Sequence, residues 1–218
     1  MLVDEESLRV VQQIYSEVGE AVRRRLSDFD RLWKQGSEED LFSEMAFCLL
    51  TPQSRAKVCW AAVTKLRDTG LLFHGSPEEI AEHLRGVRFK LRKSEYIVLA
   101  REQFARDGKL RVREGIAGLG RPYEAREWLV KNVKGYGYKE ASHFLRNIGL
   151  GRGLTILDRH ILKNLKRLGV IEEVPSSLTK KRYLEIEERM KEFAGQAGIP
   201  VEQLDLVLWY KEAGEVFK

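Results

Sequence analysis

The sequence predicts an all-α protein, because apolar residues recur at helical spacing along nearly the whole chain. In the first predicted helix, Val11, Ile14, Val18 and Val22 recur with charged residues between them. Helix start signals precede several such segments, and no convincing strand alternation interrupts them. The chain also lacks a Gly/Ser linker, a low-complexity tract and a clear internal repeat. We therefore expect its 218 residues to form a single helical unit.

The individual helices follow from caps and periodicity. Ser37 is followed by three acidic residues, which oppose the positive end of a helix. Ser76 precedes Pro77 and two further acids, which is typical of a cap followed by proline at the first helical position. A third helix is expected from Val58 to Leu66. Further helices are predicted at roughly 91–106, 122–133, 138–149, 158–168, 179–194 and 201–212.

Composition limits the class of protein. Hydrophobic residues make up 43% and charged residues 33%, enough apolar material for a true core. The net charge of +5 fits a nucleic-acid partner without proving one. No apolar run approaches the roughly 20 residues of a membrane span, and the acidic N-terminus lacks a secretory pattern, so we expect a cytoplasmic, nucleoid-associated protein without membrane contact. Cys48 and Cys59 are too few for a disulfide framework and are interpreted as small buried hydrophobes.

The stretch from Glu124 to His160 carries the most chemical information. A predicted helix ends near Val133, the segment Lys134-Gly135-Tyr136-Gly137-Tyr138 follows, and a new helix begins by Lys139. The two glycines allow a sharp reversal of the chain, and backbone N–H groups beside a helix N-terminus can point at a phosphate. An ordinary corner between two helices is the alternative interpretation.

The helix after this corner places Lys139 away from the core. Its apolar residues form one stripe at i, i+3, i+4 and i+7 from Ala141, whereas Lys139, His143 and Arg146 fall on the opposite face. Nineteen residues after Lys139, Asp158 follows four mostly apolar residues and begins the next predicted helix. A solvated lysine and an N-cap aspartate are the simpler interpretations. We expect Asp158 to be both a cap and a catalyst.

Together, a glycine hairpin, a lysine directly after it and an aspartate nineteen residues later resemble the helix-hairpin-helix DNA glycosylase superfamily. The four C-terminal cysteines of its iron–sulfur branch are absent. The chain resembles best the compact archaeal and thermophile type of 8-oxoguanine DNA glycosylase/AP lyase. The resemblance spans nearly the whole chain and rests on GYGYKEASHFLRNIG, ILDRHI, LLTPQS and LWYKEAGEVFK.

This resemblance implies two helical lobes with the active site in the cleft between them. We expect one helical lobe at about 50–135. The other lobe is formed by both chain ends, about 1–49 together with 136–218. The implied partner is double-stranded DNA that contains a damaged base, bound by a monomer. No cofactor or metal ligand set is expected, although hairpins of this family often hold a structural monovalent cation with backbone carbonyls.

The implied reaction is attack of the Lys139 amine on C1′ of the damaged nucleotide. The base is displaced, a Schiff base forms with the opened sugar, and β-elimination cuts the strand on the 3′ side. The amine must be neutral to attack, and burial in a closed protein–DNA site together with nearby cations would disfavour its charge. Asp158 would stabilise the cationic sugar and assist proton transfer.

The target base lies inside the duplex and must be flipped out. In LLTPQS, Pro52 can interrupt a helix and leave Gln53 exposed, and relatives place an inserting amide side chain at this point. A helix cap or loop residue is the alternative for Gln53. Phosphates would be held by the amides of Gly135 and Gly137, with Lys134 and Arg146 as basic side chains.

Four residues are candidates for the base pocket. His143 lies one helical turn from Lys139, although it could equally be a structural histidine. Phe89 and Trp209 could stack on the extruded purine, but single aromatic residues are more often part of a core. In the resembled family a terminal lysine, here Lys218, closes the pocket and helps to recognise 8-oxoguanine.

Three other functions compete with 8-oxoguanine removal. A glycosylase/lyase for another oxidised base would use the same lysine and aspartate. A non-catalytic helix-hairpin-helix module would bind DNA but would not need these two residues so placed. A metal-dependent nuclease would need a dense carboxylate cluster or a His/Cys set, and the sequence contains neither.

Overall fold

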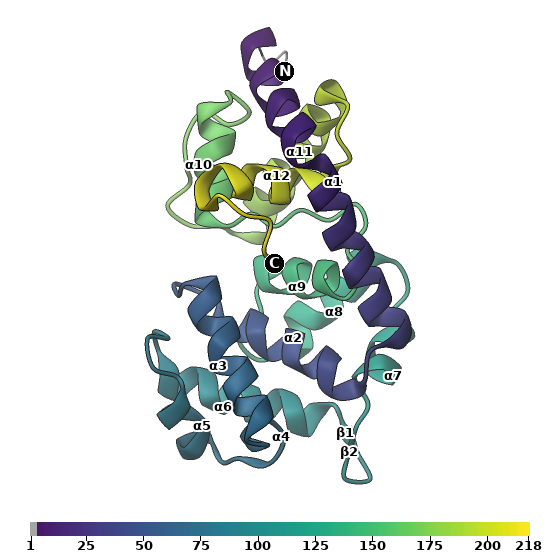
Figure 1. The fold of residues 1–218 in the computed structure, drawn as a ribbon, viewed down its shortest axis with the longest axis vertical. Coiled ribbons are helices and arrows are strands. Elements are labelled where there is room, and N and C mark those ends of the chain that lie inside the picture. Colours follow the sequence, from purple (N-terminus) through teal and green to yellow (C-terminus); the bar gives the residue numbers. More distant parts are fainter. Residues whose placement is uncertain (1–3) are drawn as a thin grey trace.

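A computed structural model describes residues 4–218, and helices account for nearly all of its regular structure (Figure 1). The all-α prediction is confirmed. In chain order the elements are α1 (Glu5–Gln35), α2 (Glu38–Leu50), α3 (Ala56–Asp68), α4 (Leu71–His74), α5 (Pro77–His83), α6 (Lys90–Gln103), β1 (Ala105–Arg106), β2 (Lys109–Leu110), α7 (Val112–Ala117), α8 (Pro122–Asn132), α9 (Tyr138–Asn147), α10 (Arg159–Arg167), α11 (Lys180–Ala197) and α12 (Val201–Ala213).

The buried apolar side chains gather in two clusters. The middle cluster is formed by α2 to α9, and the end cluster by α1, α10, α11 and α12. Helix α1 belongs to both, because Val11, Val18 and Val22 lie in the end cluster while Leu32 and Trp33 pack against the middle one. Figure 1 shows the two groups of helices stacked along the long axis of the molecule, with α1 running beside both.

The division of the core differs from the expected lobe boundaries. Helix α2, expected with the chain ends, is the centre of the middle cluster, where Leu41, Phe42 and Met45 are fully buried. Helix α9 packs against it through Phe144 and Leu145 rather than joining the end cluster. The physical reason is that α2 is apolar on nearly all sides, so it needs neighbours all around it. The middle cluster therefore runs from α2 to Leu154.

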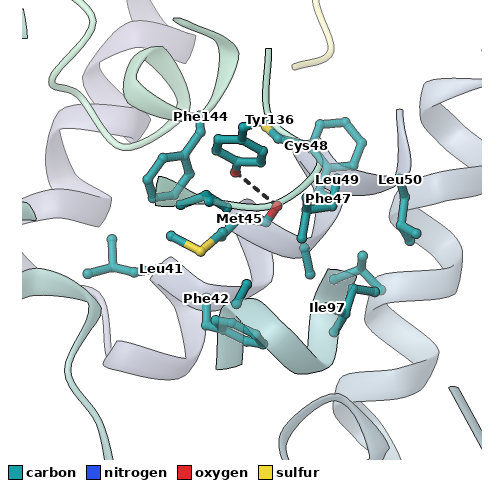
Figure 2. Packing of buried hydrophobic residues seen from close by; sticks show 14 of the residues in the cluster. Leu41, Phe42, Met45, Phe47, Cys48, Leu49, Leu50, Ile97, Tyr136 and Phe144 are labelled. Carbon is teal, nitrogen blue, oxygen red and sulfur yellow. Dashed lines mark hydrogen bonds between the residues drawn. The ribbon is translucent and has the colours of Figure 1, made fainter. Parts of the chain in front are cut away.

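Tyr136, in the turn between α8 and α9, anchors this turn to the middle cluster. Its hydroxyl donates a hydrogen bond of 3.0 Å to the Met45 carbonyl, and its ring lies beside Phe144 (Figure 2). Burial raises the pKa of Tyr136 well above its usual value, so the hydroxyl remains a donor. The turn is thus fixed against α2 by the fold itself.

A buried ion pair joins the two clusters. Arg126 of α8 donates to both carboxylate oxygens of Glu187 of α11, at 2.7 and 2.9 Å, and both side chains are 1% exposed. Burial alone would raise the pKa of Glu187, but hydrogen bonds and the charge of Arg126, with the Thr155 amide, lower it overall. The rings of Tyr123, Tyr138 and Tyr183 surround the guanidinium at 5.1 to 5.6 Å. The pair is therefore charged and fully enclosed.

Most sequence signals for helix starts are confirmed. Ser37 and Ser76 each form a capping box, and both cysteines are buried and free, as expected. Helices α4 and α7 and the β1–β2 hairpin were not anticipated, because each is too short to show periodicity. Within residues 4–218, no helix is long and apolar enough to cross a membrane.

The buried ion pair generates the first prediction. Glu187→Gln leaves Arg126 charged and enclosed without its counter-ion, so it should lower the free energy of unfolding by about 3 kcal/mol or more, measured by urea denaturation. The matched control is Glu5→Gln, which breaks a surface pair with Arg9 whose side chains are 77% and 85% exposed, and should leave the midpoint unchanged. Equal midpoints for the two variants would contradict this assignment.

Candidate active site

A cavity of about 1080 Å³ lies between the two clusters. The middle cluster contributes the loop after α2 and one face of α9, and the end cluster contributes the start of α10 and part of α12. The last residues of the chain also reach it, and Figure 1 shows the C-terminus between α12 and α9. Lys139 and Asp158 both line this cavity, each supplied by a different cluster.

Lys139 enters the cavity from the first turn of α9. Its Nζ donates a hydrogen bond of 2.9 Å to Thr51 Oγ1 and lies 3.8 Å from a carboxylate oxygen of Glu140. The Lys139 side chain is 19% exposed and lines the cavity. The amine is held by a neutral hydroxyl and remains accessible to a ligand.

Asp158 is the N-cap of α10, as the sequence predicts. One carboxylate oxygen, Oδ1, accepts hydrogen bonds of 2.8 Å from the amides of both His160 and Ile161. The residues before it are fixed by α11, because Glu187 accepts from the Thr155 amide at 3.0 Å and Tyr183 donates to the Thr155 carbonyl at 2.7 Å. The position of the carboxylate is therefore set from both sides.

The turn between α8 and α9 is a true hairpin, but its two glycines differ. Gly135 has φ +93°, and a Cβ there would approach the Tyr96 ring to 2.4 Å, so only glycine fits. Gly137 is extended, and its amide donates to Glu140 Oε2 at 3.2 Å. Contrary to expectation, the Gly137 amide is thus occupied within the protein, while Lys134 is exposed at the corner.

The inner wall of the cavity carries buried polar side chains. His143 and Arg146 share a face of α9 with Lys139, as predicted, but are only 6% and 5% exposed. Burial lowers the pKa of His143 well below its usual value, and the charges of Lys139, Arg146 and Lys218 act in the same direction. Its imidazole is therefore neutral near pH 7.

The sequence suggested that Arg146 contacts backbone phosphates, but the structure does not leave its side chain available for this. It is buried and lies 3.3 Å from Asp205 of α12, with Phe29 beneath its guanidinium. Burial raises the pKa of Asp205, although the charge of Arg146 opposes the effect. The pair spans the cavity from one cluster to the other.

The chain end closes one side of the cavity. The Lys218 ammonium contacts the carboxylate of Glu44, which is 3% exposed, and lies 3.4 Å from the centre of the Trp60 ring. Burial lowers the pKa of Lys218, and Glu44 opposes this shift. Asn147 donates a further hydrogen bond of 2.9 Å to Glu44.

The remaining candidates divide into two groups. Gln53 and Trp209 line the cavity, and Trp209 packs edge-on against His160 at 5.0 Å between ring centres. Phe89 does not line it: this residue is 54% exposed at the N-cap of α6, with φ +57°. The expectation that Phe89 forms part of the base pocket is therefore corrected, because α6 directs it to the surface.

A family model described as 8-oxoguanine DNA glycosylase (Ogg-HhH) matches residues 22–199. This chain belongs to that family. A relative in Fusobacterium nucleatum named 8-oxoguanine DNA glycosylase/AP lyase is 48% identical over 95% of this chain and 96% of its own length. One of the same name in Korarchaeum cryptofilum is 43% identical over 93% of each chain.

Solved structures of the same family share the fold. The 8-oxoguanine DNA glycosylase of Thermotoga maritima has a TM-score of 0.86 and 40% identity, and covers 98% of this chain and 99% of its own. The Methanocaldococcus jannaschii 8-oxoguanine glycosylase/lyase, in complex with DNA containing 8-oxoguanine, has a TM-score of 0.87 and 33% identity over 97% of this chain and 99% of its own. The family and fold predictions are confirmed.

Three residues at or behind the cavity wall escaped the sequence analysis: Thr51 and Asp205 line the cavity, and Glu44 contacts its lining residue Lys218. Thr51 lies within LLTPQS but had no assigned role, and Glu44 and Asp205 are acids embedded in apolar helices. The sequence signal for Glu44 and Asp205 is an acidic residue between apolar residues that are expected to be buried. A buried carboxylate needs a polar or charged partner, so this pattern predicts one. Within the described part of the chain, no group of three or more His, Cys, Asp or Glu side chains could hold a metal ion.

The capping role of Asp158 can be measured apart from any chemistry. Asp158→Ala removes the acceptor of two amides and should lower the free energy of unfolding by about 1 kcal/mol. Asp158→Asn retains an oxygen acceptor and should cost only a few tenths. Urea denaturation at pH 7 distinguishes them, and equal destabilisation would show that the side chain does not cap α10.

Proposed function

We propose that this chain removes 8-oxoguanine from duplex DNA and then cleaves the strand at the resulting abasic site. The observation that carries the proposal is that an accessible amine, Lys139, and a fixed carboxylate, Asp158, line one cavity large enough for a purine nucleotide. The names of the relatives, and a similar structure bound to DNA containing 8-oxoguanine, support this choice of lesion over another oxidised base.

In the proposed reaction the neutral Lys139 amine forms a bond to C1′ while the bond from C1′ to the base breaks. The base leaves with the electron pair and takes up a proton. The nitrogen then loses one proton, the C1′–O4′ bond breaks and O4′ takes up a proton, which leaves a protonated Schiff base between C1′ and the lysine. Removal of a proton from C2′ forms the C2′–C3′ double bond and expels the 3′ phosphate with its bonding electron pair, while the iminium accepts the negative charge that develops at C2′. Asp158 stabilises positive charge on the sugar. Thr51 orients the amine of Lys139 through the hydrogen bond that its hydroxyl accepts.

Recognition of the base is assigned to the polar and aromatic wall of the cavity. Trp209 offers a face for stacking, and the neutral imidazole of His143 offers one donor and one acceptor. Lys218 lines the same cavity with a side chain that is 11% exposed, and it would approach the base from the chain end. Gln53 is exposed at the cavity and is assigned to fill the space that the flipped base leaves.

The wider setting is proposed on the same basis. The enzyme acts as a monomer at the nucleoid, with duplex DNA as its partner and without a catalytic cofactor. Lys134 is exposed beside the hairpin and is assigned to the DNA backbone. We retain as a proposal that hairpin carbonyls hold a monovalent cation.

The nucleophile is tested by borohydride trapping on duplex DNA that contains 8-oxoguanine. Wild-type protein should become covalently attached to the DNA, because reduction of a Schiff base is irreversible, whereas Lys139→Gln should give no adduct and no strand cleavage. Binding to the same duplex should persist in the variant. An adduct with Lys139→Gln would assign the nucleophile to another amine.

The role of the chain end is tested by deleting Phe217 and Lys218. Loss of the Lys218 ammonium should reduce 8-oxoguanine excision at least about tenfold, the effect of one lost charged contact. Cleavage of a pre-formed abasic site should change little, because no base needs to be recognised there. Gel assays of the two activities in parallel give the comparison, and equal losses would exclude a recognition role.

A further inference from the structure

Gln53 holds an unusual backbone conformation. Its φ of +55° lies in the left-handed region, which residues other than glycine rarely adopt. The side chain is exposed at the cavity, between Pro52 and Ser54. Such a conformation persists only where its surroundings determine it, so the contacts of its two neighbours are informative.

Those contacts come from one buried ammonium group on α6. Lys93 is 4% exposed, and its Nζ donates to the carbonyls of Leu50 at 2.7 Å and Pro52 at 2.6 Å, and to the Ser54 hydroxyl at 3.2 Å. The three acceptors lie before and directly on both sides of Gln53. All three ammonium donors are thereby used on a single turn of the chain.

A lysine at this place is costly without a function. Its acceptors are two carbonyls and a hydroxyl rather than a carboxylate, so its charge is buried without a direct counter-ion. An apolar side chain of similar length would fill the same space but would leave the Pro52 carbonyl without this hydrogen bond. The buried charge is therefore tied to the geometry of the turn that it binds.

We infer that Lys93 is a positioning residue, which holds the turn at Gln53 so that the amide side chain can enter the duplex when the base is flipped out. The inference rests on the proposed function and deepens it. The same turn contains Thr51, which accepts the hydrogen bond from Lys139. Lys93 thus supports both the inserting residue and the partner of the nucleophile.

The charge of Lys93 gives the turn a pH dependence. Burial lowers the pKa of Lys93 to about 8, Lys139 and Arg88 act in the same direction, and Cys59 and Glu140 oppose them. Below this pH the ammonium makes three charge-assisted hydrogen bonds. Above it the neutral amine has only two weaker donors. The hydrogen bonds from Lys93 are therefore complete well below pH 8 and weaken as the pH rises through about 8.

The decisive variant is Lys93→Met, compared with Lys109→Met as the same substitution at an exposed position in β2. For each protein, kcat/KM for 8-oxoguanine removal is measured on a duplex and on the single strand of the same sequence. We expect the duplex-to-single-strand ratio to fall about tenfold in Lys93→Met, as for one lost charged hydrogen bond, and to stay unchanged in the control. Circular dichroism and thermal melting establish that both variants are folded.

The pH profile separates a positioning role from a merely structural one. In the wild type the ratio should decline as the pH rises through about 8. The ratio should show no such step in Lys93→Met. A folded variant with a wild-type ratio, or with equal losses on both substrates, would overturn the inference.

Ser54→Ala provides a second route if Lys93→Met does not fold. This substitution removes the Ser54 hydroxyl, which accepts from the Lys93 ammonium and, at 3.0 Å, from the Arg88 amide. The charge of Lys93 stays in place. It should lower the ratio in the same direction, and an unchanged ratio counts against the inference. Borohydride trapping on single-stranded abasic DNA keeps the two proposals distinguishable. A wild type that gives no adduct refutes the proposed function, whereas adducts with an unchanged ratio refute only the role of Lys93.

Discussion

The Arg126–Glu187 pair is the interaction on which the geometry of the cavity depends. Lys139 and Asp158 belong to different hydrophobic clusters, so neither core alone can fix their relative position. Arg126 lies in the helix that leads into the hairpin, and Glu187 also binds the segment that leads to Asp158. The enclosed carboxylate of Glu187 thereby connects the helix before Lys139 to the segment before Asp158. Specific geometry, more than net stability, is what such a buried pair provides.

The cavity wall departs from the usual rule that charges stay on the surface. Glu44, Arg146, Lys93 and Asp205 are each less than one tenth exposed. Arg146 and Asp205 line the cavity, Glu44 contacts its lining residue Lys218, and Lys93 binds the loop after α2. In a low-dielectric setting these groups keep fixed orientations and need no reorganisation when charge develops on a ligand. The same setting keeps His143 neutral. The energetic cost of burial is concentrated where chemistry requires it.

Sequence reasoning succeeded where the signal was local. The helices, the cap at Asp158 and the shared face of Lys139 and His143 follow from spacing alone. It failed where a distant partner decides the outcome: Arg146 was expected at phosphate, but its partner Asp205 lies in a helix near the chain end. The prediction for Phe89 was wrong for a related reason, since nothing in the local sequence indicates its left-handed φ. Lobe boundaries depend on packing, which periodicity does not report.

Helix α1 has a mechanical consequence for the molecule. Its 31 residues pack along the end cluster and continue to the middle one without a break (Figure 1). A hinge motion between the end cluster and the middle cluster would have to bend α1. Helices resist sharp bending where they contain no proline or inserted side chain. Closure of the two clusters around a ligand would therefore require α1 to bend. The proposed partner, duplex DNA, kinks readily at flexible steps and can supply the deformation that this helix resists.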